Sequence, residues 1–413
     1  MSSYRSLLRI PGAPAFFLAA AVGRVGIAMT GLALVWLVHA RTGSYGTAGL
    51  VTAGFALAEA LIGPQLARVV DRLGQTRVLP FSLLAHGAAI TAVLLTTSLP
   101  TTSLPTTSLP TTSLPTTSLA ALIVAAICAG AAVPQLGALS GARWAHLLRA
   151  ERSAELPAAF ALESLANATA FLLGPVLAAT LGAAGHPAVA TAIAATLIVT
   201  GGAALTAQPR TAPPPAASTA PGTEGSLLRP AFLLTAMLNL AIGLYFGTLS
   251  VAVSAFAVGR GTPGAAAPIM AAASLGGLLS GWLYGLRRHR TPADRQLILV
   301  TAYLTGAGLL LPLAPSPIWL GAAVVLTEAA VPPTLVLLSI RTERSVHPGV
   351  LTQAFTWNNS SSAAGSALAA SLAGHLADAA GAPAAFTLAP AAGLLLLTLS
   401  LAARRQTAHP QTT

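Results

Sequence analysis

Long apolar runs separated by short polar connections recur along almost the whole chain. A helix needs about 20 mostly apolar residues to cross the roughly 30 Å hydrocarbon core of a bilayer, and most of these runs reach or exceed that length. We therefore expect membrane-spanning helices over twelve ranges: 13–38, 45–67, 78–97, 119–142, 156–181, 187–207, 230–258, 262–286, 297–313, 317–340, 350–379 and 383–403. The pattern predicts an all-α integral membrane protein.

One polar segment divides the twelve runs into two sets of six. Residues 208–229 are rich in Pro, Ala, Thr and Ser and show no periodicity, which is typical of a flexible linker. The sequence therefore predicts an N-terminal six-helix bundle over residues 1–207, a cytoplasmic linker over 208–229, and a C-terminal six-helix bundle over 230–413.

The basic residues indicate the orientation of the spans. All 21 are arginines. With the predicted spans, eighteen lie on one side of the membrane, Arg41 and Arg260 lie on the other, and Arg24 lies inside a span. Because short cytoplasmic loops carry the excess of Lys and Arg, we expect both termini to be cytoplasmic, in a multi-pass protein of a bacterial cytoplasmic membrane. This asymmetry accounts for the net charge of +11 without a nucleic-acid partner.

Composition excludes several other classes of protein. Charged residues make up 8% of the chain and hydrophobic residues 54%, whereas an average soluble domain is about 25% charged. The single Cys128 provides neither a disulfide framework nor a cysteine-based metal site, and we expect no metal and no cofactor. A chain without lysine also lacks the phosphate-binding Gly-x-x-x-x-Gly-Lys loop of a primary pump.

A tandem TTSLP repeat occupies the predicted outer loop between spans three and four, within residues 96–119. Proline and β-branched threonine every few residues disfavour a helix. The repeat is interpreted as an expansion tolerated in an exposed loop; the alternative is a surface recognition or glycosylated stalk.

The loop after the second span carries the most specific motif. It contains Asp71, Arg72, Gly74 and Arg77 and resembles the signature loop of the major facilitator superfamily, Gly-x-x-x-Asp-Arg-x-Gly-Arg-Arg or Lys. It departs from that signature in two places, with Ala67 for Gly and Gln75 for a base. The resemblance implies two six-helix bundles that alternate in access to a central site, and a loop that latches the cytoplasmic faces of the two halves. The alternative is a set of solvated loop charges that fix topology.

A degenerate second copy of the loop is expected between spans eight and nine. Gly281, Gly285, Arg287 and Arg288 fit this copy, with Gly285 at the position of the acid. Loss of the acid predicts an asymmetric latch.

Span five contains Gly174 and Pro175, which resemble part of the small-residue motif of the drug and proton antiporters of the same superfamily. Alanines stand at the other glycine positions of that motif, and in so alanine-rich a chain the match can also arise by chance. The arginine motif that these antiporters carry in span four is missing, because residues 119–142 contain no charge.

Four charged residues fall inside predicted spans and away from the last residues of a span, where a charge costs roughly 2.5–3.5 kcal/mol or more and therefore indicates function. Arg24 and Glu59 lie at similar depth in spans one and two, and they form either a structural ion pair or a proton-sensitive one. Glu163 lies near one end of span five and can extend toward the interface. Glu328 lies in the middle of span ten without an evident partner and is assigned either a structural role or substrate or proton binding.

Several polar residues are candidates for lining a central cavity: Asn239, Tyr245, Trp357 and Asn358. In this fold, sites lie near the membrane midplane between the halves. His86 and His375 also lie in spans, where single histidines are mostly hydrogen-bonded packing residues.

These features together predict a secondary transporter and not an enzyme, since no clustered catalytic motif occurs in the spans. We expect a monomer in the lipid bilayer that exports a small hydrophobic or amphipathic molecule in exchange for protons. The alternative is proton-coupled uptake of a sugar or amino acid. A membrane-embedded enzyme, a channel or a non-transporting sensor is a more distant alternative.

Overall fold

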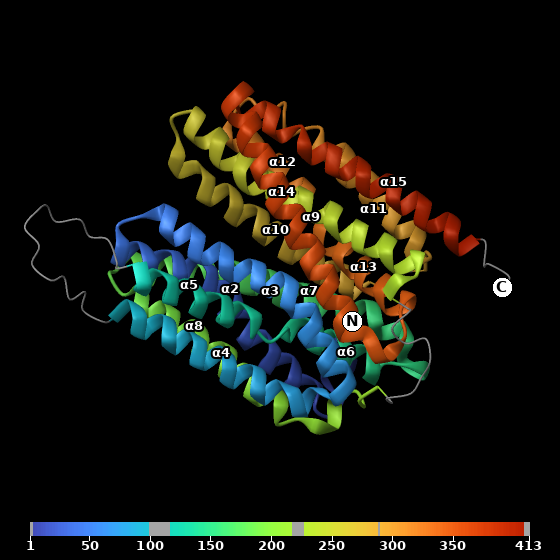
Figure 1. Ribbon diagram of the computed structural model, residues 1–413. Coiled ribbons are helices and arrows are strands. Elements are labelled where there is room, and N and C mark those ends of the chain that lie inside the picture. Colours follow the sequence, from blue (N-terminus) through green and yellow to red (C-terminus); the bar gives the residue numbers. More distant parts are fainter. Residues whose placement is uncertain (1–2, 99–115, 217–226, 288–289, 409–413) are drawn as a thin grey trace, which may run out of the picture. The chain divides into compact units, whose positions relative to one another are not determined.

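The computed structural model describes residues 3–98, 116–216, 227–287 and 290–408, and every regular element in these ranges is a helix (Figure 1). The predicted TTSLP repeat loop, the middle of the predicted linker, and Arg288 lie wholly or largely outside the described residues. The chain separates into two compact units. The N unit comprises residues 10–143 and 169–216, and the C unit comprises residues 1–9, 144–168 and 217–413.

The N unit is built around two groups of packed helices. Helix α2 (Ala13–Thr42) packs along α8 (Pro187–Thr206), while α3 (Tyr45–Leu73) and α4 (Gln75–Ser98) pack against α5 (Thr116–Ala131). Residues 136–143 of α6 (Leu136–Leu147) and residues 169–183 of α7 (Leu156–Ala183) also belong to this unit. Gly74 alone separates α3 from α4, and its φ of 95° is open to glycine and strained for other residues.

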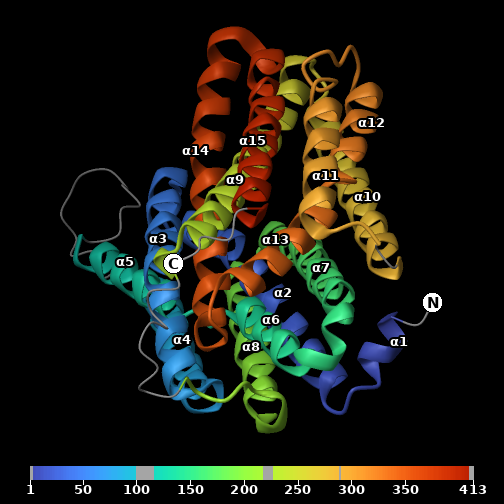
Figure 2. The ribbon, with the colours of Figure 1, turned by 90° about the vertical axis from the view of Figure 1, so that its right-hand side faces the viewer.

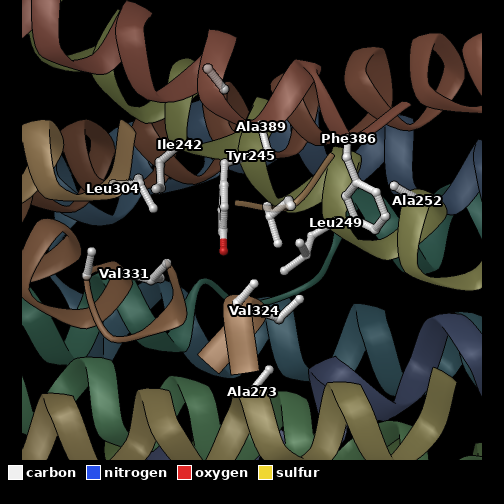
Figure 3. Packing of buried hydrophobic residues seen from close by; sticks show 14 of the residues in the cluster. Ile242, Tyr245, Leu249, Ala252, Ala273, Leu304, Val324, Val331, Phe386 and Ala389 are labelled. Atoms are coloured by element: carbon white, nitrogen blue, oxygen red, sulfur yellow. The ribbon is translucent and has the colours of Figure 1, made fainter. Parts of the chain in front are cut away.

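The C unit holds the remaining helices. Their bounds are α1 (Ser3–Leu8), η1 (Ala150–Glu155), α9 (Pro230–Gly259), α10 (Ala266–Leu286), α11 (Ala293–Gly308), α12 (Pro317–Glu328), α13 (Val331–Ser345), α14 (Leu351–Phe386) and α15 (Leu388–Ala408). Figure 2 shows α9, α14 and α15 side by side, and α10, α11 and α12 side by side. Their core surrounds the fully buried Tyr245 (Figure 3).

Helices occur at all twelve predicted spans, and ten segments among the described residues are long and apolar enough to cross a membrane. Two fall outside that group: α11 has 16 residues, and α14 carries many polar side chains. The prediction of a continuous helix is wrong for spans four and ten. Each is interrupted near its middle and forms two helices, α5 and α6 in span four and α12 and α13 in span ten. A further boundary differs because α14 continues through a bend at Gly381.

Helices α9 and α14 approach so closely that glycine is required at their crossing. A Cβ at Gly243, Gly247 or Gly365 would overlap a carbonyl oxygen of the opposite helix, that of Ser362, Ser366 or Leu240 respectively. In a bilayer, where apolar burial drives helix association weakly, small residues allow this backbone contact. The C unit therefore depends on the smallest residue at three positions.

Candidate functional site at two interrupted helices

The span-four helix breaks between Ala131, the end of α5, and Leu136, the start of α6. Pro134 has no N–H and disfavours the helical conformation of the residue before it. The N–H of Val133 bonds to the Gly130 carbonyl and that of Leu136 bonds to the Pro134 carbonyl. The carbonyls of Ala129 and Ala132 thus lose the donors that a continuous helix would give them.

Helix α4 supplies replacement donors. Ser82 Oγ donates to the Ala132 carbonyl at 2.7 Å, and His86 Nδ1 lies 2.9 Å from the Ala129 carbonyl. Because a carbonyl only accepts, the His86 ring carries its proton on Nδ1. His86 therefore stabilises the interruption as a hydrogen-bonded packing residue.

Two charged residues reach the far side of the same interruption. Arg24 Nη2, from α2, donates to the Gly137 carbonyl at 3.5 Å. The Glu59 side chain, from α3, is hydrogen-bonded to the side chain of Gln135. Gln135 and Gly137 are two residues apart, so the structure brings Arg24 and Glu59 to one short segment; a direct ion pair between them stays a prediction.

The crossing of α3 explains why the carboxyl group at this site comes from α3. A Cβ at Gly130 would overlap the carbonyl oxygen of Phe55. Position 130 of span four therefore has no space for a side chain. Glu59 lies one helical turn beyond Phe55. At this level of the interruption the carboxyl group therefore lies on α3, whose Phe55 carbonyl fills the space beside Gly130.

The C unit contains a second interruption of the same kind, between Glu328, the end of α12, and Val331, the start of α13. Hydroxyl groups again bond to carbonyls of this segment: Ser280 Oγ donates to Ala329, and Tyr303 Oη donates to Leu326 at 3.1 Å.

Glu328 has a partner that the sequence did not indicate. Tyr245 Oη lies 3.2 Å from Glu328 Oε1 and 2.7 Å from Thr327 Oγ1. In Figure 3 the Tyr245 hydroxyl points from α9 into the space between the apolar side chains of the core. Tyr245, which was assigned to a cavity, is thus part of the Glu328 site.

A repeated sequence underlies the two interruptions, and sequence analysis missed it. Residues 131–134 and 329–332 both read Ala-Ala-Val-Pro, and an arginine follows nine residues after each proline, at Arg143 and Arg341. Searching for a self-match between the two halves would have found both breaks.

Each of these arginines contacts a polar residue at the start of the preceding span. Arg341 Nη1 lies 3.4 Å from Asp294 Oδ1, at the start of α11. Arg143 Nε donates to Gln75 Oε1 at 2.8 Å, at the start of α4. Gln75 replaces the base of the signature loop, and a base there would face the Arg143 cation. The departure from the signature therefore has a physical reason.

Arg143 is fully buried and corrects two expectations. It also donates to Thr211 Oγ1 at 2.6 Å and to the carbonyls of Gln208 and Leu205 at 2.9 and 3.0 Å. With its donors satisfied, the charge is accommodated and span four extends to Leu147, so this span does contain an arginine. The first residues of the predicted linker are bonded to the bundle instead of lying free.

The signature loop also holds the linker. The Ala216 N–H donates to the Asp71 carbonyl at 2.9 Å, and Pro215 lies beside Gly74. Arg72 and Arg77 are exposed at the ends of α3 and α4. The role of these residues as a latch stays a prediction.

The chain matches the Major Facilitator Superfamily over residues 16–342. It belongs to this superfamily. Solved structures with the same fold include the human organic anion transporter MFSD10, with 18% identity, a TM-score of 0.69, and 94% of this chain and 98% of that one covered. A second is a bacterial homologue of the iron transporter ferroportin in an outward-facing state, with 13% identity, a TM-score of 0.77, and 95% of this chain and 99% of that one covered. A third is the E. coli fucose:proton symporter FucP, with 12% identity, a TM-score of 0.71, and 96% of this chain and 99% of that one covered. None of the curated proteins matches the sequence significantly.

The second copy of this major facilitator's signature loop is occupied by the N-terminal helix. Tyr4 Oη, from α1, donates to the Trp282 carbonyl at 3.1 Å, and a Cβ at Gly285 would overlap that hydroxyl and lie 2.7 Å from Ala161 Cβ. Burial raises the pKa of Tyr4 to about 12, so the phenol remains a donor at physiological pH. The acid is absent at position 285 because α1 packs there. Gly281 similarly packs against Pro332, and Arg287 is exposed.

Restoring the acid should therefore release α1. In Gly285→Asp the new side chain displaces Tyr4, and we expect tryptic cleavage after Arg9 to become at least several-fold faster, as measured by mass spectrometry of the purified protein. Gly264→Asp is the control, because a Cβ there meets nothing within 4 Å. Equal cleavage rates in the two variants would contradict this packing.

The remaining predicted residues are accommodated locally. Trp144 Nε1 donates to Glu163 Oε1 at 2.8 Å, Asn239 Nδ2 donates to the Thr235 carbonyl at 2.8 Å, and Asn358 Nδ2 donates to Thr342 Oγ1 at 2.6 Å.

Trp357 is partly exposed. Gly174, next to Pro175 in α7, packs so tightly on α2 that a Cβ would lie 2.8 Å from the Met29 nitrogen. Within the described residues, no group of three or more His, Cys, Asp or Glu could hold a metal ion.

Proposed function

We propose that this major facilitator is a proton-coupled antiporter that exports a hydrophobic or amphipathic compound, with Glu59 as the proton carrier. It works as a monomer in the bacterial cytoplasmic membrane, with both termini cytoplasmic. Membership of the superfamily and the shared fold support secondary transport. The position of Glu59 at the interrupted helix supports proton coupling.

The surroundings of Glu59 suit a carboxyl group that gains and loses a proton. Its hydrogen-bond partner, Gln135, is a neutral amide that can donate to a carboxylate and accept from a carboxylic acid. The Arg24 guanidinium donates to the Gly137 carbonyl, two residues from Gln135, and carries a charge opposite to that of an ionised Glu59. Proton binding at Glu59 therefore changes the balance of charge at the break, and this balance couples the gradient to the change of access.

Export is preferred to uptake because of the close packing at Gly174. The small-residue motif of the antiporters allows helix five to approach a neighbouring helix, and Gly174 does this against α2. Uptake of a sugar or amino acid is the second candidate, and it is favoured by the similarity in fold to a fucose:proton symporter.

The test uses everted vesicles with an imposed proton gradient and a fluorescent pH reporter. Lipophilic drugs and neutral sugars are added in turn to vesicles that contain the wild type, Glu59→Gln or Asp378→Asn. Gln keeps the shape and hydrogen bonding of Glu59 but binds no proton, while Asp378 is an exposed acid and serves as the control. We expect drug-dependent proton release in the wild type and in Asp378→Asn, reduced at least tenfold in Glu59→Gln. Proton movement with a sugar alone would overturn export, and an unchanged Glu59→Gln would overturn its role.

A further inference from the structure

The Tyr245 hydroxyl is the centre of a hydrogen-bond chain in the C unit. It contacts both Glu328 Oε1 and Thr327 Oγ1, and Thr327 Oγ1 lies 2.9 Å from the Val324 carbonyl. Tyr245 and Thr327 are fully buried. A tyrosine has one hydroxyl proton, so it can donate to only one of its two partners at a time.

The hydrogen bonds among Glu328, Tyr245 and Thr327 can all be formed in two arrangements, which differ by one proton. With Glu328 protonated, the carboxyl donates to Tyr245, Tyr245 to Thr327, and Thr327 to the Val324 carbonyl. With Glu328 ionised, Thr327 donates to Tyr245 and Tyr245 donates to the carboxylate. Rotation of two hydroxyl groups interconverts these arrangements, so neither requires a heavy atom to move.

The described groups around Glu328 carry no positive charge, so its carboxylate becomes neutral by binding a proton. Tyr245 faces it from α9 and the hydroxyl of Tyr303 bonds to the segment from α11, while α10 presents Gly277 and Ser280. The described part of the chain gives Glu328 no basic partner. An uncompensated carboxylate inside a span is costly, and binding a proton removes that cost.

The repeat shows why the acid lies on the broken helix in this half. Position 328 corresponds to Gly130 in the other half, where the Phe55 carbonyl leaves no space for a side chain. At position 328 the neighbouring helix presents Gly277, and a Cβ there would still lie 3.7 Å from Glu328 Oε2. Each unit thus places one carboxyl group at its interrupted helix, from α3 in the N unit and from α12 in the C unit.

We propose that Glu328, Tyr245 and Thr327 form a second proton-binding site, so that each unit of the transporter binds one exchangeable proton. The proposal rests on proton coupling as the proposed function, but the binding of the second proton is measured without transport. Glu328 is the binding group, and the two hydroxyls position its proton.

The first experiment is infrared difference spectroscopy of the purified, full-length protein during a pH titration. The C=O stretching band of a protonated carboxylic acid is followed in the wild type, Glu328→Gln, Tyr245→Phe and Thr327→Val. We expect one titrating band to disappear in Glu328→Gln, and the same band to change frequency in Tyr245→Phe and in Thr327→Val. Tyr303→Phe is the matched control, because its hydroxyl bonds to a backbone carbonyl at the same break, and it should leave the band unchanged.

The outcomes separate this site from the proposed function. If Glu59→Gln removes a different band and keeps the Glu328 band, the two sites are independent. If Glu328→Gln leaves the titrating bands unchanged while retaining the wild-type melting temperature, Glu328 exchanges no proton and the proposal is wrong, whatever the vesicle assay shows. Where transport is measured, Glu328→Gln should halve the protons moved per substrate; an unchanged ratio would also overturn it.

Discussion

Gly247→Val should prevent the C unit from folding. A Cβ at this position overlaps the carbonyl oxygen of Ser366 and lies 2.7 Å from its carbon. Overpacking of side chains costs typically about 1–3 kcal/mol, but here the obstacle is the backbone of α14, which cannot rotate away. The two helices would have to separate along their contact, and the C unit would lose its most extensive helix pairing. We expect no monodisperse protein on size-exclusion chromatography after detergent extraction.

The control for this variant is Gly374→Val, on α14 itself. It makes the same change of side chain, but a Cβ there meets nothing within 4 Å. It should extract and elute like the wild type, with a melting temperature within a few degrees. A normal elution profile for Gly247→Val would show that α9 and α14 do not approach as closely as described.

Arg143→Gln should destabilise the N unit and release the start of the linker. The guanidinium donates to Gln75, Thr211 and two carbonyls. Its removal takes the donor from Gln75 Oε1 and Thr211 Oγ1, while the carbonyls of Leu205 and Gln208 keep only the longer bonds, each 3.3 Å, from the Gln208 N–H and Thr211 Oγ1. Each unsatisfied group costs about 1–3 kcal/mol, offset in part by the desolvation that the buried cation no longer incurs. We expect a net loss of roughly 2–4 kcal/mol. Lysine should not rescue the site, because an ammonium lacks the planar fork that reaches several acceptors at once.

The release of the linker gives a second, local readout. Arg210 is exposed, but it lies in the short helix η2 (Pro209–Thr211), which Arg143 holds through Thr211. Trypsin cleaves chain that unfolds locally, so cleavage after Arg210 should become at least tenfold faster in Arg143→Gln, as identified by the masses of the fragments. Arg149→Gln removes an exposed arginine a few residues away and should change neither stability nor cleavage. Identical cleavage in both variants would contradict the clamp.

The sequence by itself determined the class of fold, because the thickness of a bilayer sets the length of the apolar run that a spanning helix needs. It also determined the family, since Asp71, Arg72 and Gly74 stand at the spacing of a known loop. In the structure Gly74 has a positive φ, which glycine adopts without strain. Glu59 and Glu328 could be singled out as candidates because an ionisable residue inside a long apolar run is costly and can be recognised from the sequence.

Only the tertiary structure decided what those charges contact. A proline in an apolar run can kink a helix or leave it continuous, and packing against α4 and α3 is what shows that span four opens at Pro134. The sequence alone places Arg143 among the eighteen arginines on the cytoplasmic side, because its acceptors come from positions 75, 205, 208 and 211, which lie far from it along the chain. The pairing of Tyr245 with Glu328, and the exclusion of an acid at Gly285 by Tyr4, likewise depend on close contacts between distant segments. Hydropathy places a residue in the membrane, but only the packed helices determine which polar groups meet there.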